Sequence, residues 1–186
     1  MKTPLAFLAL FLFVCGASAQ KKTVYGVNMK EIVCSLEEYA QFAENGDLSA
    51  LKDKSRPCAT ISVRGDSEAS MAGTQKMKAL PKDEGSPELR EEDLGEVGVT
   101  LSAGIYENEG DDGVFFRVEL KYTLNELAGF MEFKKGRMVP AFKTESVDTT
   151  VYTYPFVPVV VGTFARSGKD GPKVVIYTVE VSDRPH

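Results

Sequence analysis

The chain has 186 residues, of which 27 are acidic and 22 basic, and its formal net charge at pH 7 is −5. This acidic balance, without a basic patch, argues against nucleic acid as a partner and against electrostatic docking on anionic lipid. The one histidine is His186, so hydrolysis through an imidazole base and a zinc site have no histidine candidate inside the chain.

The first nineteen residues have the pattern of a secretory signal. Lys2 gives a positive start, and residues 5–14 form an apolar core that is too short to span a bilayer as a stable helix. Ala17-Ser-Ala19 then fits the small-x-small cleavage pattern. An uncleaved N-terminal anchor is the alternative. We expect residues 1–19 to be a signal peptide and the protein to be exported, to the periplasm, the outer membrane or the medium.

Two cysteines follow the signal, Cys34 and Cys58. In an exported chain such a pair favours one disulfide. Closing the loop between them would contribute roughly 3 kcal/mol in the chain-entropy model. Two buried free thiols are the alternative, because the sequence gives no geometry. On compartment alone, we predict a Cys34–Cys58 disulfide.

One helix is predicted near the start of the mature chain. Ser35-Leu-Glu-Glu38 has the spacing of a capping box, in which two side chains bind the free amides of the first turn. Apolar residues then recur at helical spacing, and Asn45-Gly46 is a typical stop. The pattern predicts a helix over residues 36–44. Residues 23–29 before it read as a short strand or extended arm.

Shorter strand patterns and one polar segment follow the helix. Residues 58–64 read as a strand that ends at Gly65-Asp66, and the next strand begins near residue 69. Residues 76–95 are rich in charge and interrupted by prolines, which predicts an exposed acidic loop. The ordered ligand spacing of a calcium loop is missing there.

Residues 96–124 carry the clearest pattern in the chain. Apolar residues occupy odd positions up to residue 105, and after the turn Gly110-Asp-Asp-Gly113 they occupy even positions. Period-two alternation buries one face of a strand, and two such runs around a Gly/Asp-rich tip predict an antiparallel hairpin. The residues expected in the core are Val97, Val99, Leu101, Ala103, Ile105, Phe116, Val118, Leu120, Tyr122 and Leu124. Four further elements are predicted at residues 129–133, 145–154, 157–165 and 174–181.

The sequence shows no catalytic constellation. Neither Gly-x-Gly-x-x-Gly nor a phosphate-binding Gly-Lys-Ser/Thr element occurs, and the carboxylates lie in loop-like runs such as residues 107–112. Most strand aromatics are expected in the core, and a barrel whose aromatics line a ligand cavity is the alternative. We therefore predict no catalytic residue, no metal ligand and no cofactor, and the residues that would bind any ligand stay unknown.

Several segments follow one another in an informative order. They are Pro57-Cys-Ala-Thr-Ile-Ser-Val-Arg-Gly-Asp-Ser-Glu-Ala69, Glu96-Val-Gly-Val-Thr-Leu101, Gly113-Val-Phe-Phe-Arg-Val-Glu-Leu120, Leu127-Ala-Gly-Phe130, Val139-Pro-Ala-Phe-Lys-Thr-Glu-Ser-Val-Asp-Thr-Thr-Val151, Val159-Val-Val-Gly-Thr-Phe164 and Val174-Val-Ile-Tyr-Thr-Val179. In this order they resemble the β-domain of secretins, the outer-membrane channel subunits of type II and type III secretion and type IV pilus systems.

The resemblance covers about residues 36–182. It implies a mainly β fold, an antiparallel or mixed sheet of hairpins with one short N-terminal helix. It divides the chain into the signal peptide, an N-terminal segment over 20–56, a secretin-like β-domain over 57–182 and a tail over 183–186. The implied role is non-enzymatic, in cell-envelope assembly or protein secretion, and a small exported ligand-binding barrel or sandwich is the alternative.

The same resemblance implies protein partners or self-assembly through sheet edges, and leaves contact with a membrane open. The chain also departs from the family. The signature expected between the last two strands is replaced by Arg166-Ser-Gly-Lys-Asp-Gly171, and an amphipathic lip helix is not visible. The membrane pore of secretins is therefore not carried over to this chain.

Overall fold

The computed structural model describes residues 23–76, 95–111, 113–133, 137–168 and 171–183. Within these residues the elements are, in chain order, β1 (Val24–Ser35), α1 (Leu36–Asn45), the 3-10 helix η1 (Ser49–Lys54), β2 (Ser55–Arg64), β3 (Ser67–Lys76), β4 (Glu96–Gly110), β5 (Gly113–Phe133), β6 (Arg137–Thr153), β7 (Val159–Gly168) and β8 (Gly171–Asp183). No helix in this part of the chain is long and apolar enough to cross a membrane.

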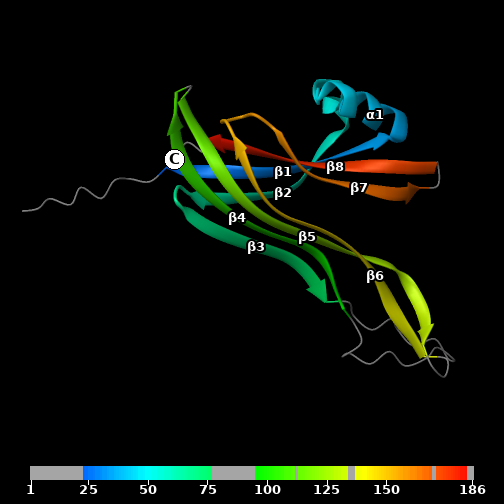
Figure 1. The fold of residues 1–186 in the computed structure, drawn as a ribbon. Coiled ribbons are helices and arrows are strands. Elements are labelled where there is room, and N and C mark those ends of the chain that lie inside the picture. The colour runs from blue at the N-terminus through cyan, green and yellow to red at the C-terminus, as the bar shows by residue number, and fades with distance from the viewer. Residues whose placement is uncertain (1–22, 77–94, 112, 134–136, 169–170, 184–186) are drawn as a thin grey trace, which may run out of the picture.

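The strands form two four-stranded sheets that pack face to face (Figure 1). The first sheet has the order β2-β1-β8-β7 and the second has the order β3-β4-β5-β6. All the strand pairs of the described residues are antiparallel. The mainly β fold class predicted from the sequence is confirmed, with purely antiparallel pairing in place of a mixed sheet.

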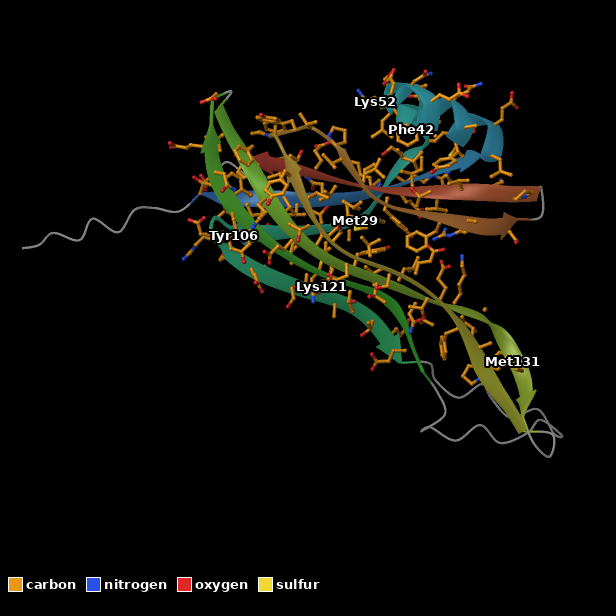
Figure 2. The ribbon with its side chains drawn as sticks, in the orientation of Figure 1. Met29, Phe42, Lys52, Tyr106, Lys121 and Met131 are labelled. Carbon is orange, nitrogen blue, oxygen red and sulfur yellow. The ribbon has the colours of Figure 1, made fainter. Side chains whose placement is uncertain are left out.

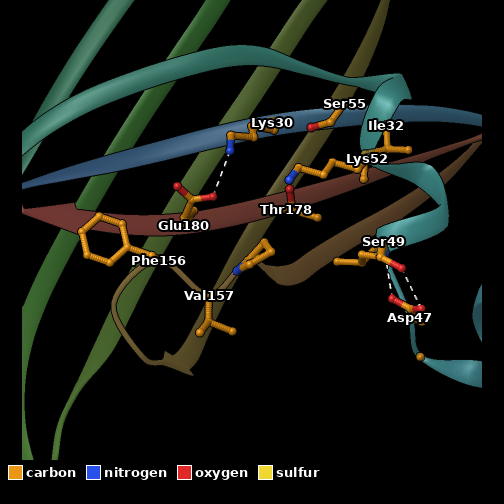
Figure 3. Close-up of a pocket in the computed structure, with 13 residues that line it drawn as sticks. Lys30, Ile32, Asp47, Ser49, Lys52, Ser55, Phe156, Val157, Thr178 and Glu180 are labelled. Carbon is orange, nitrogen blue, oxygen red and sulfur yellow. Dashed lines mark hydrogen bonds and ion pairs between the residues drawn. The ribbon is translucent and has the colours of Figure 1, made fainter.

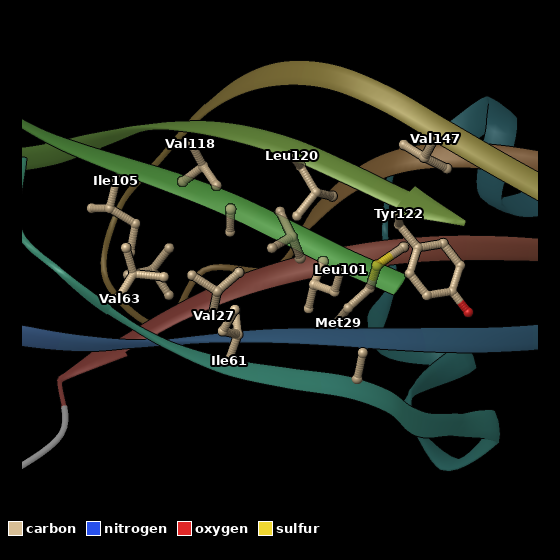
Figure 4. Packing of buried hydrophobic residues seen from close by; sticks show 14 of the residues in the cluster. Val27, Met29, Ile61, Val63, Leu101, Ile105, Val118, Leu120, Tyr122 and Val147 are labelled. Carbon is tan, nitrogen blue, oxygen red and sulfur yellow. The ribbon is translucent and has the colours of Figure 1, made fainter. Parts of the chain in front are cut away.

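The predicted central hairpin is confirmed in strand, phase and turn. β4 pairs with β5 from Gly98 opposite Asn125 to Gly110 opposite Gly113. The odd residues of β4 and the even residues of β5 point into the core between the sheets (Figure 4). Of the predicted core residues, these are buried: Leu101, Ala103, Ile105, Phe116, Val118, Leu120 and Tyr122. Val99 and Leu124 pack against them half-buried.

The predicted helix is confirmed and runs to Asn45, one residue further than expected. The Oγ of Ser35 accepts the amide N–H of Glu38 at 3.2 Å, and the Ser35 N–H donates to the Glu38 carboxylate at 2.9 Å. Gly46 ends the helix in the left-handed region, at φ +68°, and its N–H donates to the carbonyl of Phe42. The helix and η1 cover part of the outer face of the first sheet. A second apolar cluster lies between these helices and the sheet. It consists of Ile32, Cys34, Leu51, Val174 and Ile176, with Tyr39, Phe42, Leu48 and Val160 beside it.

Two strands are longer than predicted, for identifiable reasons. β1 continues from the expected end at residue 29 to Ser35 and is an inner strand of the first sheet, so residues 24–35 belong to the same sandwich as the later strands. The predicted element 129–133 is the end of β5. The pairing of β5 with β6 shifts register between Leu127 and Gly129, and this bulge breaks the alternation that would have shown one strand.

The predicted disulfide is not formed in this structure, where Cys34 and Cys58 are both free thiols. Cys34 lies on the outer face of the first sheet, where its Sγ donates to the carbonyl of Val174 at 3.6 Å. Cys58 packs against the core between the sheets. The register of β1 against β2 shifts between Met29 and Lys30, opposite Cys58, and this bulge leaves the Cys58 side chain on the inner face. The two sulfurs therefore lie on opposite faces of one sheet.

A thiol count tests this placement. We expect a chain starting at Gln20, unfolded in denaturant without reductant, to take up two alkyl groups from iodoacetamide. Burial raises the pKa of the Cys34 thiol, and burial together with the nearby Glu31 carboxylate raises the pKa of Cys58 to about 11. Alkylation of the native protein at neutral pH should therefore be much slower than after unfolding. An unfolded, unreduced chain that takes up no alkyl group would contradict the structure.

Neighbouring substitutions on β5 test the strand phase. Val118 is fully buried, so Val118→Asp places an unpaired charge in the core and should lower the free energy of unfolding by several kcal/mol. The guanidinium of Arg117 lies on the outer face, 4.3 Å from the centre of the Tyr106 ring and 3.2 Å from Glu119. Arg117→Asp should cost about 1 kcal/mol. Urea unfolding measures both values, and equal losses would show that the phase is wrong.

Candidate functional site

The β5–β6 hairpin extends beyond the rest of the sandwich (Figure 1). β4 is paired with β5 only as far as Asn125, whereas β5 and β6 stay paired to Phe133 opposite Arg137. We call the outer part, residues 126–133 and 137–143, the arm. At ~3.3 Å per residue the eight residues on its β5 side reach roughly 25 Å. Within the described residues, the arm is a two-stranded ribbon.

The arm exposes large apolar side chains. Met131, which Figure 2 labels on the arm, is 58% exposed, and Leu127 is 40% exposed. Pro140 lies in β6 opposite Phe130, at a place where a missing amide is tolerated because the strand is an edge. An isolated two-stranded ribbon is at best marginally stable in water. The arm therefore has the character of a segment that gains stability from a neighbour.

A buried ion pair lies at the base of the arm. Glu145 of β6 is only 3% exposed. Arg166 of β7 donates from Nε and Nη2 to its two carboxylate oxygens, at 2.7 and 2.5 Å. The hydroxyl of Tyr177 on β8 donates to the same carboxylate at 2.7 Å, and Lys143 Nζ lies 2.7 Å from it. The network joins the arm strand β6 to two strands of the first sheet.

The network holds fixed charges. Burial opposes ionisation of Glu145, but the hydrogen bonds from Arg166, Lys143 and Tyr177 outweigh it and hold the pKa of this carboxyl at about 2. Burial and the bond to Glu145 raise the pKa of the Tyr177 phenol far above its ordinary value. Neither group changes protonation near neutral pH, as an acid or base catalyst must. The arrangement acts as a clamp between the sheets.

Five aromatic side chains of the strands pack against one another in the interior. The ring centres of Tyr122 and Tyr177 are 5.2 Å apart, and those of Phe164 and Tyr177 are 5.6 Å apart. Tyr25 and Phe116 form a third pair, at 4.8 Å. These distances are those of ordinary aromatic packing. These five aromatics are therefore core residues and a ligand-lined interior is not favoured, whereas Tyr152 of β6 is 63% exposed and packs beside Phe115, with 6.2 Å between the ring centres.

The outer strand of the second sheet offers a second surface. β3 is paired with β4 along its whole length, and residues 70–75 are all exposed. The segment Ser70-Met-Ala-Gly-Thr-Gln75 carries no charge. Uncharged edge strands are templates for pairing with another strand. β3 and β6, which carries one side of the arm, are the edges of the second sheet, and β2 and β7 are the edges of the first.

Sequence reasoning missed Glu145 and Arg166, although a signal was present. Glu145 precedes the buried Val147 by two positions, and Arg166 follows the half-buried Phe164 by two. A charged residue in the inward phase of a strand indicates a buried pair. Among the described residues, no group of three His, Cys, Asp or Glu side chains could hold a metal ion.

No protein-family model and no curated protein matches this chain. Solved structures with a similar arrangement of strands are secretins, the family that the order of sequence motifs resembles. A chain of the Klebsiella pneumoniae type II secretion outer membrane complex (PulD, PulS and the PulC HR domain) matches 89% of this chain at 12% identity and a TM-score of 0.48. The Escherichia coli K12 type II secretin GspD matches 89% at 12% identity and 0.43, and the Vibrio cholerae competence pilus secretin PilQ matches 88% at 8% identity and 0.45.

This chain covers 38%, 48% and 58% of the length of those three chains, respectively, which is less than two thirds of each. At such identities and TM-scores, function has to be argued from the residues of this chain.

The clamp predicts an acid-dependent loss of stability. The pKa of Glu145 falls from its ordinary 4.5 to about 2 on folding. The carboxylate therefore stabilises the fold fully above pH 4.5, by about 3 kcal/mol, and this contribution is lost as the pH falls towards 2. Glu145→Gln should lower the free energy of unfolding by about 3 kcal/mol at pH 7 and flatten its pH dependence between 4.5 and 2.

Asp148→Asn is the matched control, because Asp148 pairs with Lys121 at 3.4 Å on the exposed face. It should cost about 0.5 kcal/mol or less. Urea unfolding at several pH values measures both variants. A Glu145→Gln protein with the wild-type slope in acid would show that the buried pair does not couple folding to pH.

Proposed function

We propose that this chain is an exported, non-enzymatic, secretin-like β-domain protein that acts in cell-envelope assembly or protein secretion, and that it assembles with further copies of itself through the arm. The observation that carries the proposal is the arm, a ribbon whose exposed Leu127 and Met131 have no covering strand among the described residues. The signal pattern of residues 1–19 and the order of the sequence motifs support the envelope setting.

The arm is suited to assembly because its base is held rigidly. Glu145 ties β6 to Arg166 and Tyr177 of the first sheet directly before the ribbon leaves the sandwich. A segment fixed at its base loses little further freedom when a partner binds, so less of the binding energy is spent on ordering. The clamp therefore favours one direction of the arm and a defined contact.

A second copy of this chain offers a matching surface. Each copy has an uncharged outer strand, β3, as well as the arm, and the two lie in different places on the molecule. Pairing of one with the other would be head-to-tail, which generates rings or open chains of subunits. Glu145 stays ionised and Tyr177 stays neutral around pH 7, and these fixed protonation states support a role that involves no reaction.

Sedimentation velocity of the chain from Gln20 tests the proposal. The wild-type protein should form oligomers whose share rises with concentration. Leu127→Glu with Met131→Glu places one charge on each face of the arm, because the bulge between them changes the strand phase, and should shift the protein to monomers. Leu36→Glu is the control, because Leu36 is 53% exposed on α1, away from the arm, and a carboxylate is tolerated in the first turn of a helix.

Circular dichroism should show that all three proteins are folded. A wild-type protein that stays monomeric at every concentration would refute self-assembly. An arm variant that assembles as the wild type does would place the contact elsewhere.

A further inference from the structure

A groove lies on the outer face of the first sheet, away from the arm (Figure 3). Its floor consists of outward side chains of β1 and β8, including Lys30, Thr178 and Glu180. Residues 46–49 and Lys52 form one wall, and the loop between β6 and β7 forms the other. The volume is about 470 Å³, within the range of ~300–1,000 Å³ that is usual for small-molecule sites.

The floor of the groove contains Thr178, which is 2% exposed as a whole residue and lines the groove. Its side chain makes no hydrogen bond within the described part of the chain, and its oxygen is not among the fully buried atoms that lack a partner there. The Thr178 hydroxyl is therefore available to a ligand atom in the groove. Lys52 also lines the groove, and Figure 3 shows its side chain extending over the first sheet. The groove thus offers a hydroxyl and an ammonium group to a ligand.

The charges in the groove favour a single negative charge on the ligand. Lys30 is neutralised by Glu180, at 2.9 Å. Lys52 has no carboxylate within ion-pair distance among the residues that the structure describes, so its charge is available. Asp47 lies in the wall and accepts hydrogen bonds from Ser49. After Lys30 and Glu180 cancel, one cation, Lys52, and one carboxylate, Asp47, remain, so a monoanion fits better than a dianion such as phosphate.

An apolar wall stands on the other side of the groove. Phe156 is 60% exposed and adopts φ +62°, a left-handed conformation that is strained for a bulky residue. The loop is held in place by the Phe156 N–H, which donates to the carbonyl of Val181 at 2.8 Å, and by the Thr153 hydroxyl, which donates to that of Val157 at 2.8 Å. The backbone at Phe156 is therefore held in a strained conformation, and the apolar side chains of Phe156 and Val157 lie beside the polar floor.

We infer that this groove binds a small monocarboxylate with an apolar tail. The carboxylate lies between the Lys52 ammonium group and the Thr178 hydroxyl, and the tail lies along Phe156 and Val157. This function is separate from assembly through the arm, and it differs from an interior cavity because the groove is on the outer face of the sheet.

Isothermal titration with sodium octanoate tests the inference. Octanoate should bind saturably, and octylamine and octanol should bind at least about tenfold more weakly, because each lacks the negative charge that Lys52 recognises. Lys52→Met should weaken octanoate binding by about tenfold or more, and Thr178→Val by about fivefold. Lys121→Met is the control, since Lys121 is highly exposed on the other sheet, and it should bind as the wild type does.

The apolar wall has its own test. Phe156→Ser should weaken octanoate more than butanoate, because only the longer tail reaches the ring. Each variant is checked for folding by circular dichroism. Absence of octanoate binding, equal binding of octylamine, or an unaffected Lys52→Met protein would overturn the inference, and competition by inorganic phosphate as strong as that by octanoate would refute the monocarboxylate class. The arm variant with Leu127→Glu and Met131→Glu should bind octanoate normally, which separates this result from the fate of the assembly proposal.

Discussion

The fold depends on two strands that are buried on both faces. β1 and β8 are the inner strands of the first sheet. Their inward side chains, such as Val27 and Tyr177, pack against the second sheet, while Ile32 and Ile176 point outward under the helices. Burial of both faces joins the sandwich to the helical cover with one sheet between them. Because α1 and η1 cover only part of the outer face, the remaining part is left as the groove.

The same double burial decides how much of the fold could be predicted from sequence. The hairpin of β4 and β5 has one wet face, so its alternation was clear and its phase was predicted correctly. β1 carries apolar residues on both faces after Met29. The alternation of apolar and polar residues is therefore absent there, and the sequence did not predict the second half of this strand. Cysteine parity could not show that Cys34 and Cys58 lie on opposite faces, since that depends on a one-residue bulge in β2.

The candidate sites were less accessible to sequence reasoning, because each depends on tertiary arrangement. The arm exists because β5 and β6 remain paired beyond the end of the pairing between β4 and β5. No local sequence pattern shows where each of these pairings ends. Glu145 and Arg166 come from different strands and meet only when the sheets pack. The groove draws its residues from four separate stretches of chain. The order of motifs indicates a secretin-like β-domain, whereas the arm and the groove can be seen only in the structure.

Tyr177 and Thr178 show how one strand serves both proposed functions. Tyr177 points inward and donates to Glu145 at the base of the arm, whereas Thr178 points outward into the groove. A slip of β8 by one residue would exchange the two faces, burying the threonine hydroxyl among core aromatics and removing the phenol from the clamp. The pairing of Glu31 with Tyr177 and of Lys30 with Thr178 holds β8 in register against β1. The arm and the groove therefore rest on one register, and both require the β1–β8 ladder to be intact.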